Sequence, residues 1–311
     1  MSFLYPRRPS GAGASAPNTT AFQKEGDKWK QAITIPAALK ALVLSDIHGN
    51  WAALRSVLRR SPEHDILICL GDYLSTSLGN RSVVQWVKNV RGHNSILLRG
   101  NSDSMDYYRT YGNLSRTDPR TEYGTLQSLS PTARFEVEGM RALAVHDYAK
   151  PDEYSASFRK REDLSPWITP EYIGRTLNLT GVDILLFGGM HLPYVAAASD
   201  LLIINPGAVG FNYDGDPRAS YMILEVRGNK GTVRHARIPY DIAQAASDIA
   251  GAYADSHLGL QRARGFEALV RGESPKPFKW KRMWGITRWE GKSPSARAAH
   301  SGSKPWPNPR A

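Results

Sequence analysis

The feature that most constrains this chain is an alternation of short apolar runs with segments of helical periodicity, which begins at Lys40. Such alternation is typical of βαβ units, in which helices join parallel strands. The sequence predicts helices at residues 51–59, 83–90, 242–254 and 260–270, and strands at residues 41–44, 66–70, 96–98, 141–145, 184–187, 201–204 and 221–226. The later strands have connections too short for helices, so a partly antiparallel sheet should follow the parallel part. We therefore expect an α/β protein with mixed sheets.

Composition narrows the class of protein further. The 311 residues allow one large or two modest domains, and 41% hydrophobic and 22% charged residues are ordinary for a globular protein. No run approaches the roughly 18 apolar residues that a membrane-spanning helix needs. The single cysteine, Cys69, permits neither an internal disulfide nor a thiolate-based zinc site. Any metal ion must then be held by histidine, carboxylate or amide groups, and we expect a reducing, cytoplasmic location.

The two ends of the chain differ from its middle and carry its net charge of +11. Residues 1–36 carry +3, are rich in Pro, Gly, Ala, Ser and Thr, and are predicted to form a disordered arm, with an organellar transit peptide as the alternative. Residues 271–311 carry +8 and four of the eight Trp residues. Such a tail can bind nucleic acid or an anionic membrane surface, or it can pack on the protein's own body. Residues 37–270, which have no net charge, are the expected domain.

Five polar segments stand at the ends of predicted strands, and each offers a ligand for a hard or borderline metal ion. They are residues 46–50, 71–72, 100–103, 145–147 and 188–191. Any one of them alone would more often be an ordinary turn, helix cap or buried histidine. The carboxyl ends of neighbouring strands, however, converge on one crevice in an open α/β sheet. Five such segments after five strands therefore predict one shared metal site.

In this order the segments resemble the motifs of the calcineurin-like metallophosphoesterases, particularly the small prokaryotic phosphodiesterase branch. The family pattern is Asp-x-His, Gly-Asp, Gly-Asn-His-Asp, a lone His after a strand, and Gly-His-x-His. A similar Asn-Pro-Gly segment follows at residues 205–210, and the resemblance covers about residues 40–270. It implies a double β-sheet sandwich flanked by helices, with a dinuclear metal centre. It also implies a phosphodiester substrate, hydrolysed by a hydroxide that the metal ions activate.

The resemblance also implies a role for each matching residue. The residues that match metal ligands are Asp46, His48, Asp72, Asn101, His146 and His191. Asp72 matches the carboxylate that bridges both ions, and Asn101 and His146 match ligands of the second ion. Asp72, Asn101 and Asp103 are expected to serve catalysis. The mixture of carboxylate, imidazole and amide oxygen favours Mn²⁺, with Fe or Zn²⁺ as alternatives.

Two departures from the family pattern affect the expected mechanism. Gly189 stands where the family has the first His of Gly-His-x-His, so we expect one tight and one weaker metal site, unless water or Asp147 supplies the missing ligand. Ser102 stands where many relatives have a His that can protonate the leaving group, although the prokaryotic branch tolerates another residue there. Losing a positioned general acid typically costs about 10²- to 10⁴-fold, and least for leaving groups that depart as stable anions.

Three functions are compatible with this sequence. The favoured one is a metal-dependent phosphodiesterase, because six ligand positions are retained. The second is a degenerate binding or scaffold protein of the same fold with weak or no catalysis, as in some relatives. The third is a nuclease or RNA-processing enzyme that the basic tail guides to nucleic acid. The natural substrate and the oligomeric state are not specified by the sequence.

Overall fold

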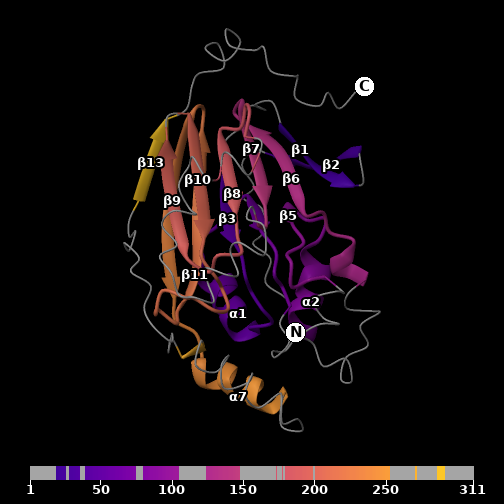
Figure 1. Ribbon diagram of the computed structural model, residues 1–311, viewed down its shortest axis with the longest axis vertical. Helices are drawn as coiled ribbons and strands as arrows, with labels where there is room; N and C mark the ends of the chain where they lie inside the picture. The colour runs from indigo at the N-terminus through magenta and orange to yellow at the C-terminus, as the bar shows by residue number, and fades with distance from the viewer. Residues whose placement is uncertain are drawn as a thin grey trace.

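The computed structural model describes residues 19–25, 28–35, 39–74, 80–104, 124–147, 173, 177, 179–198, 200–252, 270–271 and 286–290. This part of the chain forms two β-sheets that pack face to face, with α1 and α2 beside one sheet and α7 at one end of the sandwich (Figure 1). None of the helices in these ranges is long and apolar enough to cross a membrane.

The six-stranded sheet has the order β13-β12-β11-β3-β4-β5. Its strands are β3 (Leu39–Leu44), β4 (Ile66–Cys69), β5 (Ser95–Leu97), β11 (Ala219–Arg227), β12 (Lys230–Ile238) and β13 (Ile286–Glu290). β3, β4 and β5 are parallel and are connected through α1 (Trp51–Arg60) and α2 (Asn80–Val90). β11 pairs antiparallel with β3, and β12 and β13 continue antiparallel to the edge.

The seven-stranded sheet has the order β2-β1-β6-β7-β8-β10-β9. Its strands are β1 (Thr19–Glu25), β2 (Lys28–Ile35), β6 (Thr132–Val137), β7 (Met140–Val145), β8 (Ile184–Phe187), β9 (Pro193–Ala198) and β10 (Leu201–Pro206). β7, β8 and β10 are parallel, and the remaining pairs are antiparallel. The seven-stranded sheet therefore has a parallel centre with antiparallel flanks, whereas the six-stranded sheet has its parallel strands at one edge and its antiparallel strands at the other. Both sheets are mixed, as the short later connections predict.

Strand β3 shows why the apolar runs are continuous. Ala41 and Val43 belong to the core between the two sheets, whereas Leu42 and Leu44 belong to a second core beneath α1 and α2. Side chains alternate between the two faces of a strand, so a strand covered on both faces is apolar at every position. This burial holds β3 rigidly and fixes the point at which the loop after it begins.

The start of α1 is tied to a distant loop. Asn50 caps the helix, because its side-chain oxygen accepts a hydrogen bond from Ala53 N at 3.1 Å, and its Nδ2 donates to Gly210 O at 3.1 Å. Helix α7 (Ile242–Ala252) packs against α1 and Phe211 through Ala245 and Ile249. These contacts hold residues 205–211 against the loop between β3 and α1.

The predicted mixed α/β sandwich flanked by helices is confirmed, and the predicted strands and the first three helices lie within a few residues of their observed bounds. The second closing helix, residues 260–270, lies outside the described residues except for Val270. Strands β6, β9 and β12 were not predicted. All three are flanking strands. β6 and β12 are only partly buried and lack the continuous apolar run by which the others were found, whereas β9 is apolar throughout but begins with a proline.

The ends of the chain also differ from the expectation. Strands β1 and β2 lie inside the predicted disordered arm, and β1 pairs with β6, so residues 19–25 and 28–35 extend the seven-stranded sheet (Figure 1). The sequence carries a signal for this strand pair, because the turn dipeptide Gly26-Asp27 separates two runs that each contain β-branched and aromatic residues. Strand β13 lies inside the predicted tail and pairs with β12, so residues 286–290 form an edge of the other sheet.

Candidate metal centre

The polar segments singled out in the sequence meet at the carboxyl ends of the parallel strands. Asp46 and His48 follow β3, and their backbone N–H groups donate to Gly71 O at 3.0 Å and to Asp72 O at 2.9 Å. Asp72 follows β4 and Asn101 follows β5. His146 and His191 follow β7 and β8 of the other sheet. Both sheets therefore contribute to one site, as the placement after strands predicts.

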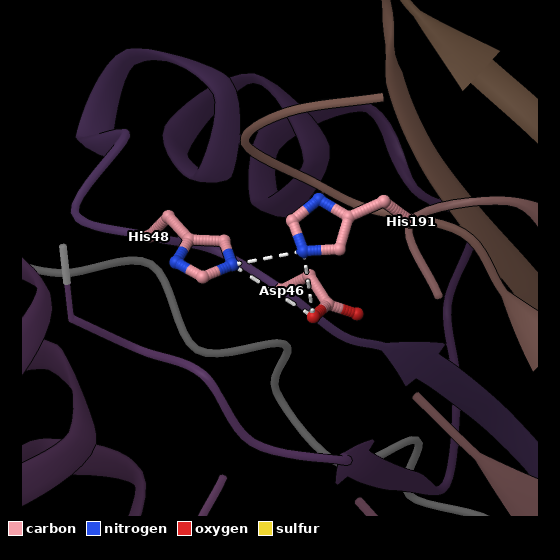
Figure 2. Close-up of side chains that lie close together, drawn as sticks. All are labelled: Asp46, His48 and His191. Atoms are coloured by element: carbon pink, nitrogen blue, oxygen red, sulfur yellow. Dashed lines mark hydrogen bonds and ion pairs between the residues drawn. The ribbon is translucent and has the colours of Figure 1, made fainter. Parts of the chain in front are cut away.

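One group of ligand atoms is formed by Asp46, His48 and His191 (Figure 2). The Nε2 of His191 lies 3.3 Å from Asp46 Oδ1, and the Nε2 of His48 lies 3.8 Å from the same oxygen. The two Nε2 atoms are 3.1 Å apart. Figure 2 shows the two rings approaching the carboxylate from different segments of the chain, so that three donor atoms converge on one point.

A second group is formed by Asp46, Asp72 and His146. His146 Nε2 lies 3.3 Å from Asp72 Oδ1 and 3.0 Å from Asn101 Oδ1. The other oxygen of Asp72, Oδ2, lies 3.5 Å from His48 Nε2. Asp72 thus presents one carboxylate oxygen to each group.

Each of the three histidine rings is held by a hydrogen bond from its Nδ1 to a backbone carbonyl. His48 Nδ1 donates to Leu74 O at 3.0 Å, His146 Nδ1 to Leu70 O at 2.8 Å, and His191 Nδ1 to Phe211 O at 2.6 Å. A backbone carbonyl can only accept, so the proton is assigned to Nδ1 in each case. Each ring therefore turns its Nε2 toward the carboxylates, which is how metal-binding histidines are commonly held.

The hydrogen bonding of the two Asp46 carboxylate oxygens shows whether these residues are suited to bind a cation. Its Oδ2 accepts a hydrogen bond from Gly189 N at 3.0 Å. Its Oδ1 is buried, and within the described part of the chain no group donates a hydrogen bond to it. A buried carboxylate oxygen without a donor is costly. A cation bound among Asp46, His48 and His191 would satisfy this oxygen, and the carboxylate, imidazole and amide donors suit Mn²⁺, Fe or Zn²⁺.

Four of these residues have an uncommon backbone conformation. The φ angles are 53° at Asp46, 49° at His48, 57° at Asp72 and 58° at His191. A positive φ outside glycine costs about 1 kcal/mol or more and persists only when the surroundings impose it. The cost at four clustered positions indicates that the loops are shaped for side-chain placement at the expense of local stability.

Burial and mutual charge set the protonation of the site. Burial opposes the charge on Asp72, but His146 holds the pKa of that carboxyl well below its ordinary value. Burial likewise opposes protonation of His146, yet Asp72 raises its pKa to about 10. The pKa of His191 is lowered, chiefly by burial. Asp72 and His146 therefore form a charged pair, and a metal ion bound at His146 would release its proton.

Residues 205–213 support the histidines in a way that the sequence did not reveal. The ring of Phe211 stacks on His48 at 5.3 Å between centroids, and the ring of Tyr213 stacks on His191 at 4.3 Å. The only sequence signal was the Asn-Pro-Gly segment before them. Asn205 Nδ2 donates to Gly188 O at 3.1 Å, which ties this segment to the loop that carries His191.

Asp103, which is expected to serve catalysis, lies in the site region beside Asp72. Its carboxylate accepts hydrogen bonds from four backbone N–H groups, those of Asp72, Tyr73, Leu74 and Gly100. Burial and the neighbouring Asp72 raise its pKa to about 6, which still leaves it ionised at neutral pH. These contacts are those of a residue that positions the loops after β4 and β5, and the catalytic role of Asp103 stays a prediction.

Ser102 and Gly189 occupy the two positions that depart from the family motifs. The Ser102 hydroxyl donates to Leu74 O at 3.1 Å, and its N–H donates to Asp72 Oδ1 at 2.8 Å. Gly189 lies beside His146, and a Cβ built on it would be 3.5 Å from His146 Nε2. Ser102 therefore supports the loop and Asp72, and Gly189 borders the second group of ligand atoms.

The two packed sheets, with Asp and His groups at the carboxyl ends of their parallel strands, define an α/β sandwich with a candidate metal centre. The family model described as the calcineurin-like phosphoesterase superfamily domain matches residues 39–229. The chain belongs to this superfamily, which confirms the resemblance drawn from the motifs.

Individual relatives are distant. The uncharacterized protein MJ0912 of Methanocaldococcus jannaschii is 26% identical over 236 residues, which cover 67% of this chain and 90% of that protein. A solved metallophosphoesterase from Sphaerobacter thermophilus is 23% identical, with a TM-score of 0.49, and the match covers 73% of this chain and 100% of that one. The hypothetical protein PH1004 from Pyrococcus horikoshii OT3 is 15% identical, with a TM-score of 0.49, and covers 72% and 97%.

Proposed function

We propose that the protein is a metal-dependent phosphodiesterase whose two metal sites are formed by Asp46, His48, Asp72, Asn101, His146 and His191. The observation that carries this proposal is the placement of Asp72. Its Oδ2 lies 3.5 Å from His48 Nε2, and its Oδ1 lies 3.3 Å from His146 Nε2. A carboxylate with one oxygen toward each histidine is suited to bridge two cations.

Divalent ions bound there would supply Lewis acidity to a phosphoryl group and lower the pKa of a water molecule. The protein's own contribution is positioning. The backbone carbonyls of Leu70, Leu74 and Phe211 orient the three imidazoles, so their Nε2 atoms need no reorganisation when ions bind. Mn²⁺ is the proposed ion, with Fe or Zn²⁺ as the alternatives that the same donors accept.

A diester substrate is proposed because of Ser102. This position holds no imidazole, and its hydroxyl donates to Leu74 O, within the loop that follows β4. Ser102 therefore offers no positioned general acid to protonate a leaving group. Esters whose leaving groups depart as stable anions lose least from this absence.

We also infer a cytoplasmic location. Cys69 is buried in β4 as a free thiol, and burial raises its pKa to about 12, so it is neither reactive nor available for cross-linking. The single cysteine therefore cannot form an internal disulfide, and proteins without disulfides are typical of reducing compartments. Cell fractionation with cytoplasmic and membrane markers tests this location, and recovery of the protein in a membrane or exported fraction would contradict it.

The activity is tested with protein stripped of metal by a chelator and then supplied with Mn²⁺, Fe²⁺ or Zn²⁺. We expect hydrolysis of bis(p-nitrophenyl) phosphate only after metal is restored, and slower hydrolysis of alkyl phosphomonoesters. Equal diester turnover by stripped and resupplied protein would contradict the metal-dependent mechanism. Faster turnover of alkyl monoesters than of the diester would contradict the proposed substrate class.

A further inference from the structure

The space beside Gly189 has two neighbours with different chemistry. A Cβ built on Gly189 would lie 3.4 Å from His146 O, 3.5 Å from His146 Nε2 and 3.6 Å from Asp147 Cγ. The position from which a side chain at residue 189 would extend is therefore flanked by the ligand nitrogen of His146 and by the carboxyl group of Asp147. All three distances are ordinary van der Waals contacts.

We propose that Asp147 supplies the carboxylate ligand that completes the second metal site, in place of the side chain that Gly189 lacks. The proposal rests on the metal centre of the proposed function. It assigns the ion near His146 four protein groups, namely Asp72, Asn101, His146 and Asp147. In place of the expected tight site and weak site, the protein would then have two complete metal sites that differ in their donor atoms.

The backbone that carries Asp147 is fixed next to the site. Asp147 directly follows His146, whose carbonyl oxygen accepts a hydrogen bond from Gly188 N at 2.9 Å. This bond holds the end of β7 against the loop that contains Gly189. The Asp147 side chain itself is exposed, and its two side-chain torsions each have more than one staggered position.

Asp147 is not yet aligned with the other donors. Among the described residues, it lies outside both groups whose ligand atoms are within 4.8 Å of one another. The proposal therefore requires a rotation of Asp147 toward His146 when the ion binds. A cation bound there would offset the repulsion between the carboxylates of Asp72 and Asp147 that this rotation brings closer together.

A carboxylate in place of an imidazole changes which ion is preferred. The site near His146 would have three oxygen donors and one nitrogen, whereas the site near His48 has two imidazoles with its carboxylates. Oxygen-rich sites suit Mn²⁺ and Mg²⁺, and imidazole-rich sites suit Zn²⁺ and Fe. The second site should therefore select Mn²⁺ over Zn²⁺ more strongly than the first.

The test uses the metal-free full chain, Mn²⁺ titration by calorimetry, and Mn²⁺ electron paramagnetic resonance to count bound ions. We expect the wild type to bind two ions and Asp147→Ala to lower the affinity for the second by roughly 10- to 100-fold. Asp147→Asn should fall between them, because an amide oxygen is a neutral donor. Asp248→Asn is the matched control, since Asp248 is an exposed carboxylate on α7 that pairs with Gln244.

A second variant separates ligation from general charge. In the Asp147→Ala background, Gly189→His should restore the second ion and shift its preference toward Zn²⁺. Gly189 has φ 74°, so Gly189→Ala in the same background measures the strain of any side chain there and should restore nothing. Recovery by Gly189→Ala would show that ligation is not the cause and would overturn the proposal.

The outcomes distinguish this proposal from the proposed function. If the wild type binds two ions and Asp147→Ala binds both unchanged, Asp147 is not a ligand and only the present inference fails. The same holds if the second ion is equally weak in both proteins. If the wild type binds no ion and shows no metal-dependent hydrolysis, the metal centre itself is wrong and both fail.

Discussion

The carboxylate of Asp103 accepts a hydrogen bond from the backbone N–H of Asp72 at 3.0 Å and so fixes the backbone of the residue that we propose to bridge two ions. The same carboxylate accepts the N–H groups of Tyr73, Leu74 and Gly100. It thereby joins the loop after β4 to the loop after β5. The position of Asp72 in the site depends on a residue that does not face the other ligands.

Asp103→Asn should therefore impair both stability and hydrolysis. The amide nitrogen would face two N–H donors that the carboxylate now satisfies, and each buried donor left unpaired costs about 1–3 kcal/mol. We expect the free energy of unfolding, measured with urea, to fall by roughly 3 kcal/mol, and diester turnover to fall with it. Asp65→Asn is the control, because exposed Asp65 accepts a single backbone N–H from Lys40. Equal stability of the two variants would contradict the positioning role.

The leaving group should determine the rate of hydrolysis. Because Ser102 offers no imidazole, the rate constant kcat/KM for a series of aryl diesters should rise steeply as the pKa of the leaving phenol falls. A missing general acid predicts about 10²- to 10⁴-fold slower turnover for poor leaving groups than for good ones. A flat dependence, with chemistry shown to be rate-limiting, would indicate that another group donates the proton.

Stability should decline in acid partly because of His235. Burial, with help from Arg237, lowers its pKa to about 4, and its Nε2 lies 2.8 Å from Ser220 Oγ. The unfolded chain takes up a proton near pH 6.5 and the folded chain only near pH 4, so this contribution is intact above pH 6.5 and is lost between those values as pH falls. His235→Gln should reduce the loss of unfolding free energy between pH 7 and pH 4.5 by about 2 kcal/mol.

This pH experiment is run in chelator, with exposed His93→Gln as the control for removing a histidine. Urea unfolding at each pH gives the free energies. If His235→Gln and the wild type lost the same free energy over this range, His235 would not be the group responsible.

The basic tail should contribute to binding of RNA or single-stranded DNA. Residues 271–311 hold ten Lys or Arg against two Glu, but β13 pairs with β12, so removing the whole tail would also remove an edge strand. A better variant ends at Glu290 and replaces Lys279, Lys281 and Arg282 by Ala. It should bind nucleic acid more weakly, with a shallower dependence on salt, while small-diester hydrolysis stays unchanged. Equal affinity at low salt would favour a tail that packs on the protein itself.

The part of the site that sequence could predict is the part fixed by strand ends. Asp46, Asp72 and His146 each follow a strand that is buried on both faces, so its apolar run identifies both the strand and the residue after it. The convergence of Asp46 and Asp72 follows from the geometry of one sheet, whereas that of His146 also depends on how the two sheets pack. The contacts of Asp103 could not be predicted from strand ends, because its four partners are backbone groups that only the folded loops bring together.

The stacking of Phe211 and Tyr213 on two of the histidines could not be predicted from the sequence either. Their rings stack on His48 and His191, which precede them by 163 and 22 positions in the sequence printed above. No local sequence pattern predicts such a contact, because it depends on how the folded chain places residues 205–213 beside the histidines. Strands β1 and β2 were missed for another reason. The Pro, Gly, Ala, Ser and Thr content of residues 1–36 outweighed a hairpin signal in their second half.

The most direct test of the account is the hydrolysis of bis(p-nitrophenyl) phosphate by Asp72→Ala, with bound Mn²⁺ counted in the same samples. Asp72 contributes little to the packed core, so the variant should keep the wild-type circular dichroism spectrum. It should lose hydrolysis down to the rate of a protein-free control, and should bind fewer ions than the wild type. Wild-type turnover by a folded Asp72→Ala variant, after contaminating phosphoesterases are removed, would contradict the proposed metal-centred mechanism.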